Sequence, residues 1–290
     1  MTFDNPDFVN KDLKNRGYDS NKLDERMMFA TRLLEEAPLD KINFVLDIGM
    51  GRGEFSLWFA KKGKTVTGTG INLNSYDLDY DLLRSNNINV VECNVEKMPF
   101  KDNSFDAVLL SHILEHCFNL GVVLKEVHRV LKKDGYLFVF LPEYASTVTA
   151  AHAVTGWNVG QLLVTLLLNG YNVKNGRFLH RNHQICAFVQ KTDIVLPLLR
   201  GDSGDNHILY KAGLFPSQLE FTDLNFEFFE GNITSINWNT NVEQDYLYTK
   251  KQQILISISK LFPKQIIRLL VFYLRIAYNT LNNYWFITKD

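Results

Sequence analysis

Cysteine is scarce in this sequence, and neither sign of charge dominates it. The three cysteines, Cys93, Cys117 and Cys186, lie far apart and never in C-x-x-C spacing. This pattern excludes a disulfide framework and a cysteine zinc cluster, and it favours a reducing compartment. Lys and Arg total 31 against 32 Asp and Glu, so the net charge of −1 gives no electrostatic basis for a nucleic-acid partner.

Long apolar segments are also missing. The N-terminal stretch MTFDNPDFVNKDLKNRG is polar and has no apolar core of a secretory signal. No uninterrupted apolar run approaches the roughly 20 residues that cross a bilayer. We therefore expect a cytoplasmic protein, with peripheral contact to a membrane as the alternative that the C-terminal sequence raises.

Charge is distributed unevenly near the C-terminus. Residues 193–249 contain nine acidic side chains and two basic ones, whereas residues 250–289 contain seven basic side chains and no acidic one. Within the latter, PKQIIRLLVFYLRIAYNTLNNYWFI places Arg268 and Arg275 on one helical stripe beside a wide apolar arc. The pattern predicts a basic amphipathic helix that packs on the domain or on a second subunit of a homo-oligomer. Contact with an anionic membrane surface is the alternative.

Five short apolar runs alternate with helical patterns in the first half of the chain. The runs are INFVLDIG, KTVTGTGIN, NINVVECNV, FDAVLLSHI and YLFVFLP. The segments EFSLWFAKKG and LGVVLKEVHRVLKKDG have helical spacing, and the second is expected to end at Gly135. Strands that alternate with helices predict a doubly wound parallel sheet, which is an α/β fold.

This pattern continues to about Lys191. WNVGQLLVTLLLNG predicts another helix, and YNVKNGRF and HQICAFVQK predict an antiparallel hairpin at the sheet edge. The hairpin completes a seven-stranded, mostly parallel sheet. We expect three regions: an N-terminal helical segment at 1–39, with a helix at about 21–36, the α/β domain at 40–191, and a C-terminal extension at 192–290.

The stretch SHILEH contains His112, Glu115 and His116 in the order H-x-x-E-H of a zinc peptidase. Such a peptidase would need both histidines on an established helix and a further ligand downstream. Here the motif follows directly on a predicted strand, so we expect no metal. Glu115 and His116 are expected to begin a helix and to settle its local packing.

A glycine-rich turn, VLDIGMGRG, follows the first predicted strand. Glycines at this place let the backbone approach a ligand and present amide groups at the start of a helix. A nicotinamide-binding loop has the spacing G-x-G-x-x-G, and its third glycine would fall on Glu54. The spacing here is D-x-G-x-G-x-G, which disfavours a nicotinamide dehydrogenase.

Together, VLDIGMGRGEFSLWFAKKGKTVTGTGIN, NVEKMPFKDNSFDAVLLSHILEH and LKEVHRVLKKDGYLFVFLP resemble class I S-adenosylmethionine-dependent methyltransferases in order and spacing. The resemblance covers about residues 42–191 and weakens after Pro142. It implies that S-adenosylmethionine is the cofactor. The residues that match the cofactor motifs are Asp47, Gly49, Gly51 and Gly53 for the methionine and ribose part, and Asn94 and Val95 for the adenine.

One position departs from the family pattern. The second strand of the family usually ends in an acidic residue that binds both ribose hydroxyls, and Gly70 stands there in this sequence. The change removes two charge-assisted hydrogen bonds. We expect Asn72 to substitute, because it lies two residues on and shares the same face of an extended strand.

Methyl transfer to a hydroxyl needs a base that takes a proton. His112, Glu143 and His152 are the candidates, because each follows a strand end at the carboxyl edge of the predicted sheet, where ligands bind. His180 and His183 flank the predicted hairpin turn and are expected to face solvent.

The resemblance implies a methyltransferase that acts on a small molecule or a glycan. The WN-GQL helix and the hairpin resemble methyltransferases encoded with bacterial surface-polysaccharide biosynthesis, which implies a sugar hydroxyl as acceptor. A lipid or quinone acceptor at a membrane surface would suit the apolar C-terminal segment instead. A catalytically inactive, methyltransferase-like binding or scaffold protein is a further alternative, favoured by Gly70 and Asn94.

Overall fold

The structure is a computed structural model that describes residues 30–31, 33–76, 78–143, 153–181, 184–202, 204–219 and 235–237 of the 290. By its internal contacts the chain divides after Trp238, and all described residues belong to the first part.

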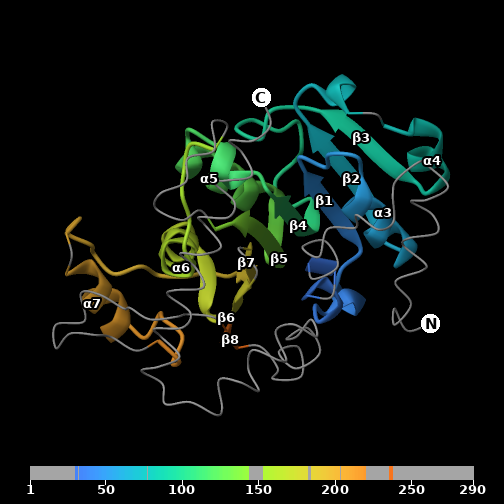
Figure 1. Ribbon diagram of the computed structural model, residues 1–290. Coiled ribbons are helices and arrows are strands. Elements are labelled where there is room, and N and C mark those ends of the chain that lie inside the picture. The colour runs from blue at the N-terminus through green and yellow to red at the C-terminus, as the bar shows by residue number, and fades with distance from the viewer. Residues whose placement is uncertain are drawn as a thin grey trace, which may run out of the picture. The chain divides into compact units, whose positions relative to one another are not determined.

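An eight-stranded sheet forms the centre of this part (Figure 1), in the order β3-β2-β1-β4-β5-β7-β6-β8. The first five strands in this order are parallel, whereas β7 runs antiparallel to β5 and β6, and β8 antiparallel to β6. The predicted doubly wound, seven-stranded sheet with its antiparallel hairpin is confirmed, and β8 adds a short eighth strand. The strands are β1 (Phe44–Ile48), β2 (Thr65–Gly70), β3 (Ile88–Glu92), β4 (Phe105–Ser111), β5 (Leu131–Pro142), β6 (Tyr171–Arg181), β7 (Gln184–Lys191) and β8 (Ser235–Ile236).

Helices cover both faces of the sheet. The α-helices are α3 (Glu54–Lys61), α4 (Tyr80–Ser85), α5 (Leu120–Val130), α6 (Val159–Leu168) and α7 (Asp205–Lys211), and short 3-10 helices lie at η2 (Leu39–Lys41), η3 (Leu73–Ser75) and η4 (Leu114–His116). Successive side chains of β5 point to opposite faces of the sheet. Leu137 and Val139 join the core formed with α5 and α6, whereas the rings of Phe138 and Phe140 contact Phe59 and Phe55 of α3.

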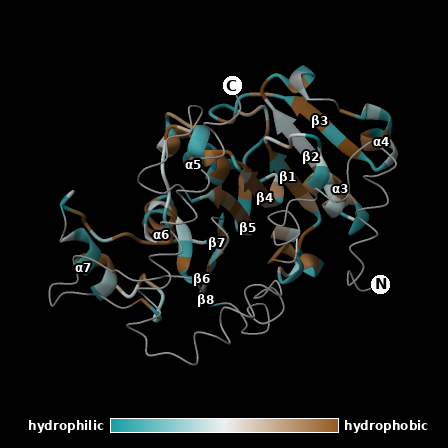
Figure 2. Cartoon of the chain, in the orientation of Figure 1, coloured by the Kyte–Doolittle hydropathy of each residue, from teal (hydrophilic) through white to brown (hydrophobic). Residues whose placement is uncertain are grey.

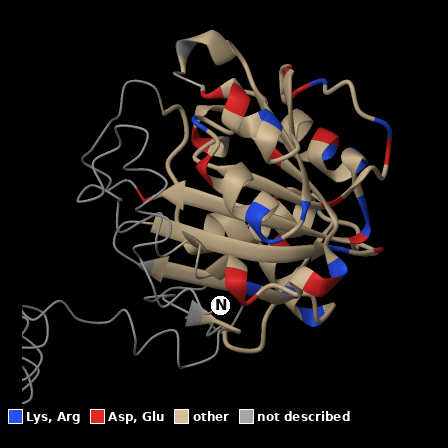
Figure 3. Ribbon diagram, turned by 90° about the vertical axis from the view of Figure 1, so that its right-hand side faces the viewer, with Lys and Arg blue, Asp and Glu red and all other residues tan. Residues whose placement is uncertain are grey.

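The distribution of apolar residues explains this arrangement. Figure 2 shows β1, β4 and β5 as predominantly hydrophobic, which is typical of parallel strands covered on both faces. Charged residues lie mostly on helices and connecting loops (Figure 3). The sheet is therefore held by burial on both sides.

The helix predicted to end at Gly135 is shorter in the structure. It ends at Val130, and Leu131 already belongs to β5. The ammonium group of Lys191 donates to the carbonyl oxygens of His128 and Leu131, each at 2.7 Å. A cation at the last carbonyls stabilises a helix end, so this contact from β7 favours the end of the helix at Val130, before the predicted Gly135.

The terminal predictions fall mainly outside the described residues. Of the helix predicted at 21–36, the structure shows helix at 30–31 and 33–35, with Leu33 and Leu34 buried. The amphipathic helix predicted near the C-terminus lies outside the described residues. No helix in the described ranges has the length and apolar character needed to cross a bilayer. The limits 1–39, 40–191 and 192–290 stay predictions, although residues 235–236 contribute β8 to the sheet.

Candidate functional site

A pocket of about 530 Å³ opens at the carboxyl ends of β1, β2, β3 and β4. The chain order reverses here, because β2 and β3 extend the sheet on one side of β1 and β4 on the other. Ligands of open α/β sheets bind at such a switch point. Four connections form the walls. They supply Gly49 and Gly51 after β1, Ile71, Leu73 and Tyr76 after β2, Cys93, Asn94, Val95 and Glu96 after β3, and His112, Ile113, His116, Cys117 and Phe118 after β4.

The glycine turn between β1 and α3 forms the wall nearest the sheet. Gly49, Gly51 and Gly53 all have positive φ, at 69°, 55° and 87°, which other residues rarely adopt. A Cβ on Gly49 would lie 2.0 Å from the side chain of Ile113, whereas a Cβ on Gly51 would meet nothing within 4 Å. Gly51 therefore keeps a part of the pocket open, and Gly53 caps the N-terminus of α3.

Asp47 lies under this turn and does not line the pocket. Its side chain is 1% exposed, and Ser56 of α3 donates a hydrogen bond to its Oδ2 at 2.7 Å. Burial raises the pKa of Asp47 to about 7, and the hydrogen bond from Ser56 only partly offsets this rise. The carboxyl group links the end of β1 to the first turn of α3, so it holds the glycine turn in place.

The wall after β2 is apolar where the sequence predicts a polar substitute. Asn72 is exposed, has φ of 58° and does not line the pocket. Leu73 is buried instead, and its Cδ2 atom would lie 2.7 Å from a Cβ placed on Gly70. Leu73 thus fills the space next to Gly70.

The wall after β3 carries the polar groups. The side-chain oxygen of Asn94 accepts a hydrogen bond from the backbone N–H of Glu96 at 2.9 Å, which fixes the turn. Asn119 donates to Oε1 of Glu96 at 3.1 Å. Among the described residues that line the pocket, Glu96 is the one acidic side chain.

His112 forms the wall at the end of β4. Its backbone has φ of 55°, and its Nδ1 atom lies 3.2 Å from Oε1 of Glu115. Glu115 is 1% exposed and belongs to the 3-10 helix η4, which begins at Leu114 and ends at His116, so the two residues lie in a short helical turn but do not begin a helix as the sequence predicts. Within the described part of the chain, no three His, Cys, Asp or Glu side chains gather in a metal-binding arrangement.

The other two predicted bases lie elsewhere. Glu143 follows β5 and lies 2.8 Å from Nε2 of His180, so His180 pairs with a carboxylate and is only part-exposed, unlike the expectation that it faces solvent. Neither residue lines the pocket. His152 and His183 lie outside the described residues.

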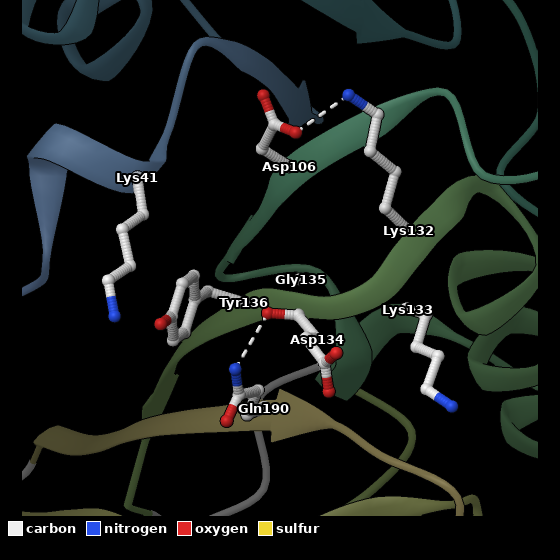
Figure 4. Close-up of a pocket in the computed structure, with 8 residues that line it drawn as sticks. All are labelled: Lys41, Asp106, Lys132, Lys133, Asp134, Gly135, Tyr136 and Gln190. Carbon is white, nitrogen blue, oxygen red and sulfur yellow. Dashed lines mark hydrogen bonds and ion pairs between the residues drawn. The ribbon is translucent and has the colours of Figure 1, made fainter.

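A second pocket, of about 270 Å³, lies at the amino ends of the parallel strands, opposite the carboxyl ends that form the first pocket. It is formed where β4 and β5 begin, by Asp106, Lys132, Asp134 and Tyr136 among others (Figure 4). Lys132 lies 2.7 Å from Asp106, and Gln190 donates to the carbonyl of Asp134 at 2.7 Å. Most charged side chains of this second pocket form ion pairs, and it lies at the opposite ends of the strands from the switch point. The first pocket is therefore the candidate site.

Sequence reasoning finds part of this pocket. Of the predicted site residues, Gly49, Gly51, Asn94, Val95 and His112 line it, and Asp47, Gly53, Asn72 and Glu143 do not. Leu73 and Glu96 are not predicted from the sequence as parts of the site, and Glu115, predicted only to pack locally, lies buried beside His112. Glu96 could have been found from its place just after the Asn94-Val95 pair, but nothing local in the sequence indicates that Leu73 covers Gly70.

Comparison with known families identifies the central segment. Residues 46–139 match a family model described as "Methyltransferase domain". The match begins in β1 and ends in β5, so it includes the four connections that form the pocket.

Two curated relatives match over similar lengths. A stretch of 102 residues is 39% identical to UbiE of Haemophilus ducreyi, named a ubiquinone/menaquinone biosynthesis C-methyltransferase, and covers 33% of this chain and 39% of that protein. A stretch of 128 residues is 30% identical to the sterol 4-C-methyltransferase strm-1 of Caenorhabditis elegans, covering 42% of this chain and 38% of that protein. The matches therefore span less than half the length of these curated relatives.

A solved structure shares the fold. The 1,6-didemethyltoxoflavin-N1-methyltransferase of Burkholderia thailandensis, crystallised with 1,6-didemethyltoxoflavin and S-adenosylhomocysteine, superposes with a TM-score of 0.51 and 22% identity. The superposition covers 64% of this chain and 86% of that chain. At this identity the likeness supports the fold alone.

The raised pKa of Asp47 predicts how stability depends on pH. The folded protein holds this proton up to about pH 7, whereas the unfolded chain releases it near 3.8, so the contribution of Asp47 to stability falls as the pH rises from about 4 to about 7. The difference corresponds to about 4 kcal/mol. Asp47→Asn keeps an acceptor for Ser56 without the titration, so its melting temperature should exceed that of the wild type at pH 8 and differ little at pH 4.5.

Thermal unfolding of both proteins across this range tests the prediction. Asp81→Asn, a change of the same kind at an exposed position of α4, is the control and should follow the wild type at every pH. Parallel curves for Asp47→Asn and the wild type would contradict the role assigned to the buried carboxyl group.

Proposed function

Residues 46–139 of this chain form a methyltransferase domain with the class I fold, and from this premise we propose that the protein binds S-adenosylmethionine and transfers a methyl group to a small-molecule acceptor. The proposal is carried by the pocket at the switch point. Its walls bring the open face of Gly51 together with Asn94, Val95 and His112 in one cavity of about 530 Å³. Cavities of roughly 300–1,000 Å³ suit ligands of this size.

The residues present suit the cofactor in most respects. Gly49 and Gly51 expose backbone at the end of β1, near the start of α3, where amide groups can bind a carboxylate. Asn94 and Val95 offer backbone and amide groups on the opposite wall for a heterocycle such as adenine. The family usually has an acidic residue where Gly70 stands, and we assign its role, binding of the ribose hydroxyls, to Glu96, whose carboxylate accepts a hydrogen bond from Asn119.

The chemistry divides between the cofactor and the chain. S-adenosylmethionine, when bound, supplies a methyl carbon that its sulfonium activates. The chain has to align the acceptor, exclude water and accept a proton from an acceptor hydroxyl. His112 lines the pocket at the end of β4, so it is the residue that we assign as the base.

For the acceptor we propose a lipid-soluble small molecule. The pocket mouth has apolar side chains from two connections, with Ile71 63% and Phe118 83% exposed. Large apolar side chains left in water at a cavity mouth suit an apolar ligand. The two curated relatives are named for quinone and sterol substrates. A sugar hydroxyl, which the sequence also suggests, is the second candidate, because His112 and Ser111 give the same pocket a polar floor.

A binding protein without catalysis is the competing class. Gly70 and the apolar Leu73 beside it would weaken the hold on ribose, and such a protein would bind the cofactor poorly or without turnover. Calorimetric titration with S-adenosylmethionine and S-adenosylhomocysteine, followed by a methyl-transfer assay, separates the two classes.

Gly51→Ala tests the cofactor site. Its new Cβ would enter the open part of the pocket, so we expect the affinity for S-adenosylhomocysteine to fall by at least about tenfold. Calorimetry is the measurement. Gly63→Ala is a matched control, because Gly63 also has positive φ and open space around its Cβ position, but lies at the end of α3 outside the pocket. Equal affinities for the two variants would place the cofactor elsewhere.

Glu96→Gln tests the proposed ribose contact. The change keeps the shape of the side chain but removes the charge, so we expect S-adenosylhomocysteine to bind about tenfold more weakly. Glu92→Gln serves as control, because Glu92 is exposed, ends β3 opposite Gly70 and does not line the pocket. A loss of affinity in the Glu92 variant alone would reassign the role.

The acceptor class is tested by activity on vesicles. We expect methylation of a quinone- or sterol-type acceptor in anionic lipid vesicles, and Phe118→Ser should lower the rate on this acceptor by about tenfold. Leu198→Ser changes a side chain that is 92% exposed but remote from the pocket, and it should leave the rate unchanged. Methylation of a free sugar or glycan, with no turnover of vesicle-bound acceptor, would favour the sugar hydroxyl instead.

A further inference from the structure

Glu115 is a buried carboxylate next to the pocket. Its side chain is 1% exposed, and its Oε2 atom has no hydrogen-bond partner among the described residues. The backbone carbonyl oxygen of Glu115 accepts hydrogen bonds from the N–H groups of Val154, at 2.7 Å, and Thr155, at 3.3 Å. Burying a carboxylate with incomplete hydrogen bonding costs stability, so we expect this carboxylate to have a function in the adjacent site.

This function lies in the contact with His112. Oε1 of Glu115 is 3.2 Å from Nδ1 of His112 and 3.8 Å from Nε2 of His116. Both are ion-pair contacts, neither has the geometry of a hydrogen bond, and the contact with His112 is the shorter. Glu115 is therefore the partner of the Nδ1 side of the His112 ring.

The backbone of His112 is constrained as well. Its φ of 55° lies in the left-handed region, which is unfavourable for a residue other than glycine. Its N–H donates to the carbonyl oxygen of Phe140 on β5 at 2.8 Å. The sheet thus fixes the backbone of His112, the 3-10 turn places Glu115 beside the ring, and 34% of the side chain remains exposed at the pocket.

We propose that Glu115 is a positioning residue that fixes the tautomer of His112. The carboxylate, 3.2 Å from Nδ1, favours the form of the ring with its proton on Nδ1, which leaves Nε2 as the acceptor for a proton from the substrate. This inference rests on the proposed function. In this role Glu115 acts on His112, whereas the sequence predicts only that it lies at the start of a helix.

The proton balance defines what the pair does. An acceptor hydroxyl that gains the methyl group loses its proton, and the electron pair of the broken carbon–sulfur bond stays on sulfur. Nε2 of His112 takes the proton, and the imidazolium that forms is paired with the carboxylate of Glu115. The proton then leaves to water through the exposed part of the His112 ring.

The neighbouring titratable groups do not replace Glu115. Cys117 donates its thiol hydrogen to the carbonyl of Ile113, and burial, with the charges of Glu115 and Glu96, raises the pKa of this thiol to about 11. Burial also raises the pKa of Cys93. Both thiols therefore stay protonated near neutral pH, and Glu96 is engaged by Asn119.

The tautomer can be measured without turnover. Nitrogen-15 chemical shifts of labelled histidine distinguish a protonated Nδ1 from a protonated Nε2, and His112→Gln identifies the signals. In the full-length wild type we expect His112 with its proton on Nδ1. Glu115→Gln keeps an acceptor oxygen and should keep this tautomer, whereas Glu115→Leu, an apolar side chain suited to a buried position, should lose it.

Kinetics give the second readout. With a hydroxyl acceptor, Glu115→Leu should lower kcat by about 100-fold with the KM for S-adenosylmethionine little changed, and Glu115→Gln should restore most of the rate. Glu92→Gln, the same kind of change at an exposed position that does not line the pocket, is the control and should leave the His112 signals as they are. The proposal is overturned if Glu115→Leu keeps the wild-type tautomer. Wild-type protein without methyl-transfer activity but with the expected tautomers would refute the proposed function and leave the assigned pairing standing.

Discussion

The site depends on the parallel pairing of β1 with β2 on one side and β4 on the other. Ile48 at the end of β1 is in register with Thr69 of β2 and with Leu110 of β4, so three strands end at one level. Because a parallel strand must be left through a connection at its carboxyl end, the chain turns over the same small area after each of these strands and again after β3, which pairs with β2. The pocket is the space between these turns, and the side chains that line it are those that the turns can carry.

Two buried carboxyl groups support this edge, and they show how the pocket is held. Asp47 bonds to Ser56 beneath the glycine turn, and Glu115 lies against His112 behind the end of β4. Each is a carboxyl group whose burial costs free energy of desolvation. Both sit directly behind a pocket wall. The protein thus accepts a cost in stability where the backbone must keep a shape that apolar packing alone would not impose.

The sequence allows most of the framework to be predicted, because the information is local. Apolar runs identify the parallel strands, and glycines with fixed spacing identify the turn after β1. The failures concern contacts between distant segments. The end of α5 at Val130 is in contact with Lys191, about 60 positions further along the chain. The apolar cover of Gly70 depends on how Leu73 folds back after a left-handed Asn72, and no pattern of residue types reveals this fold.

The short strand β8 has a consequence beyond the sheet order. An outer strand presents unpaired backbone groups that another chain can use as a template for its own strand. The strand β6 spans Tyr171–Arg181, and among the described residues β8 is the element that pairs with its outer side, at Phe178 and Leu179. Since β8 comes from a segment more than 40 residues after the hairpin, the hairpin is synthesised well before the strand that pairs with the outer side of β6. Protection of this edge from pairing with other chains therefore depends on residues 235–236, which are synthesised after the rest of the sheet.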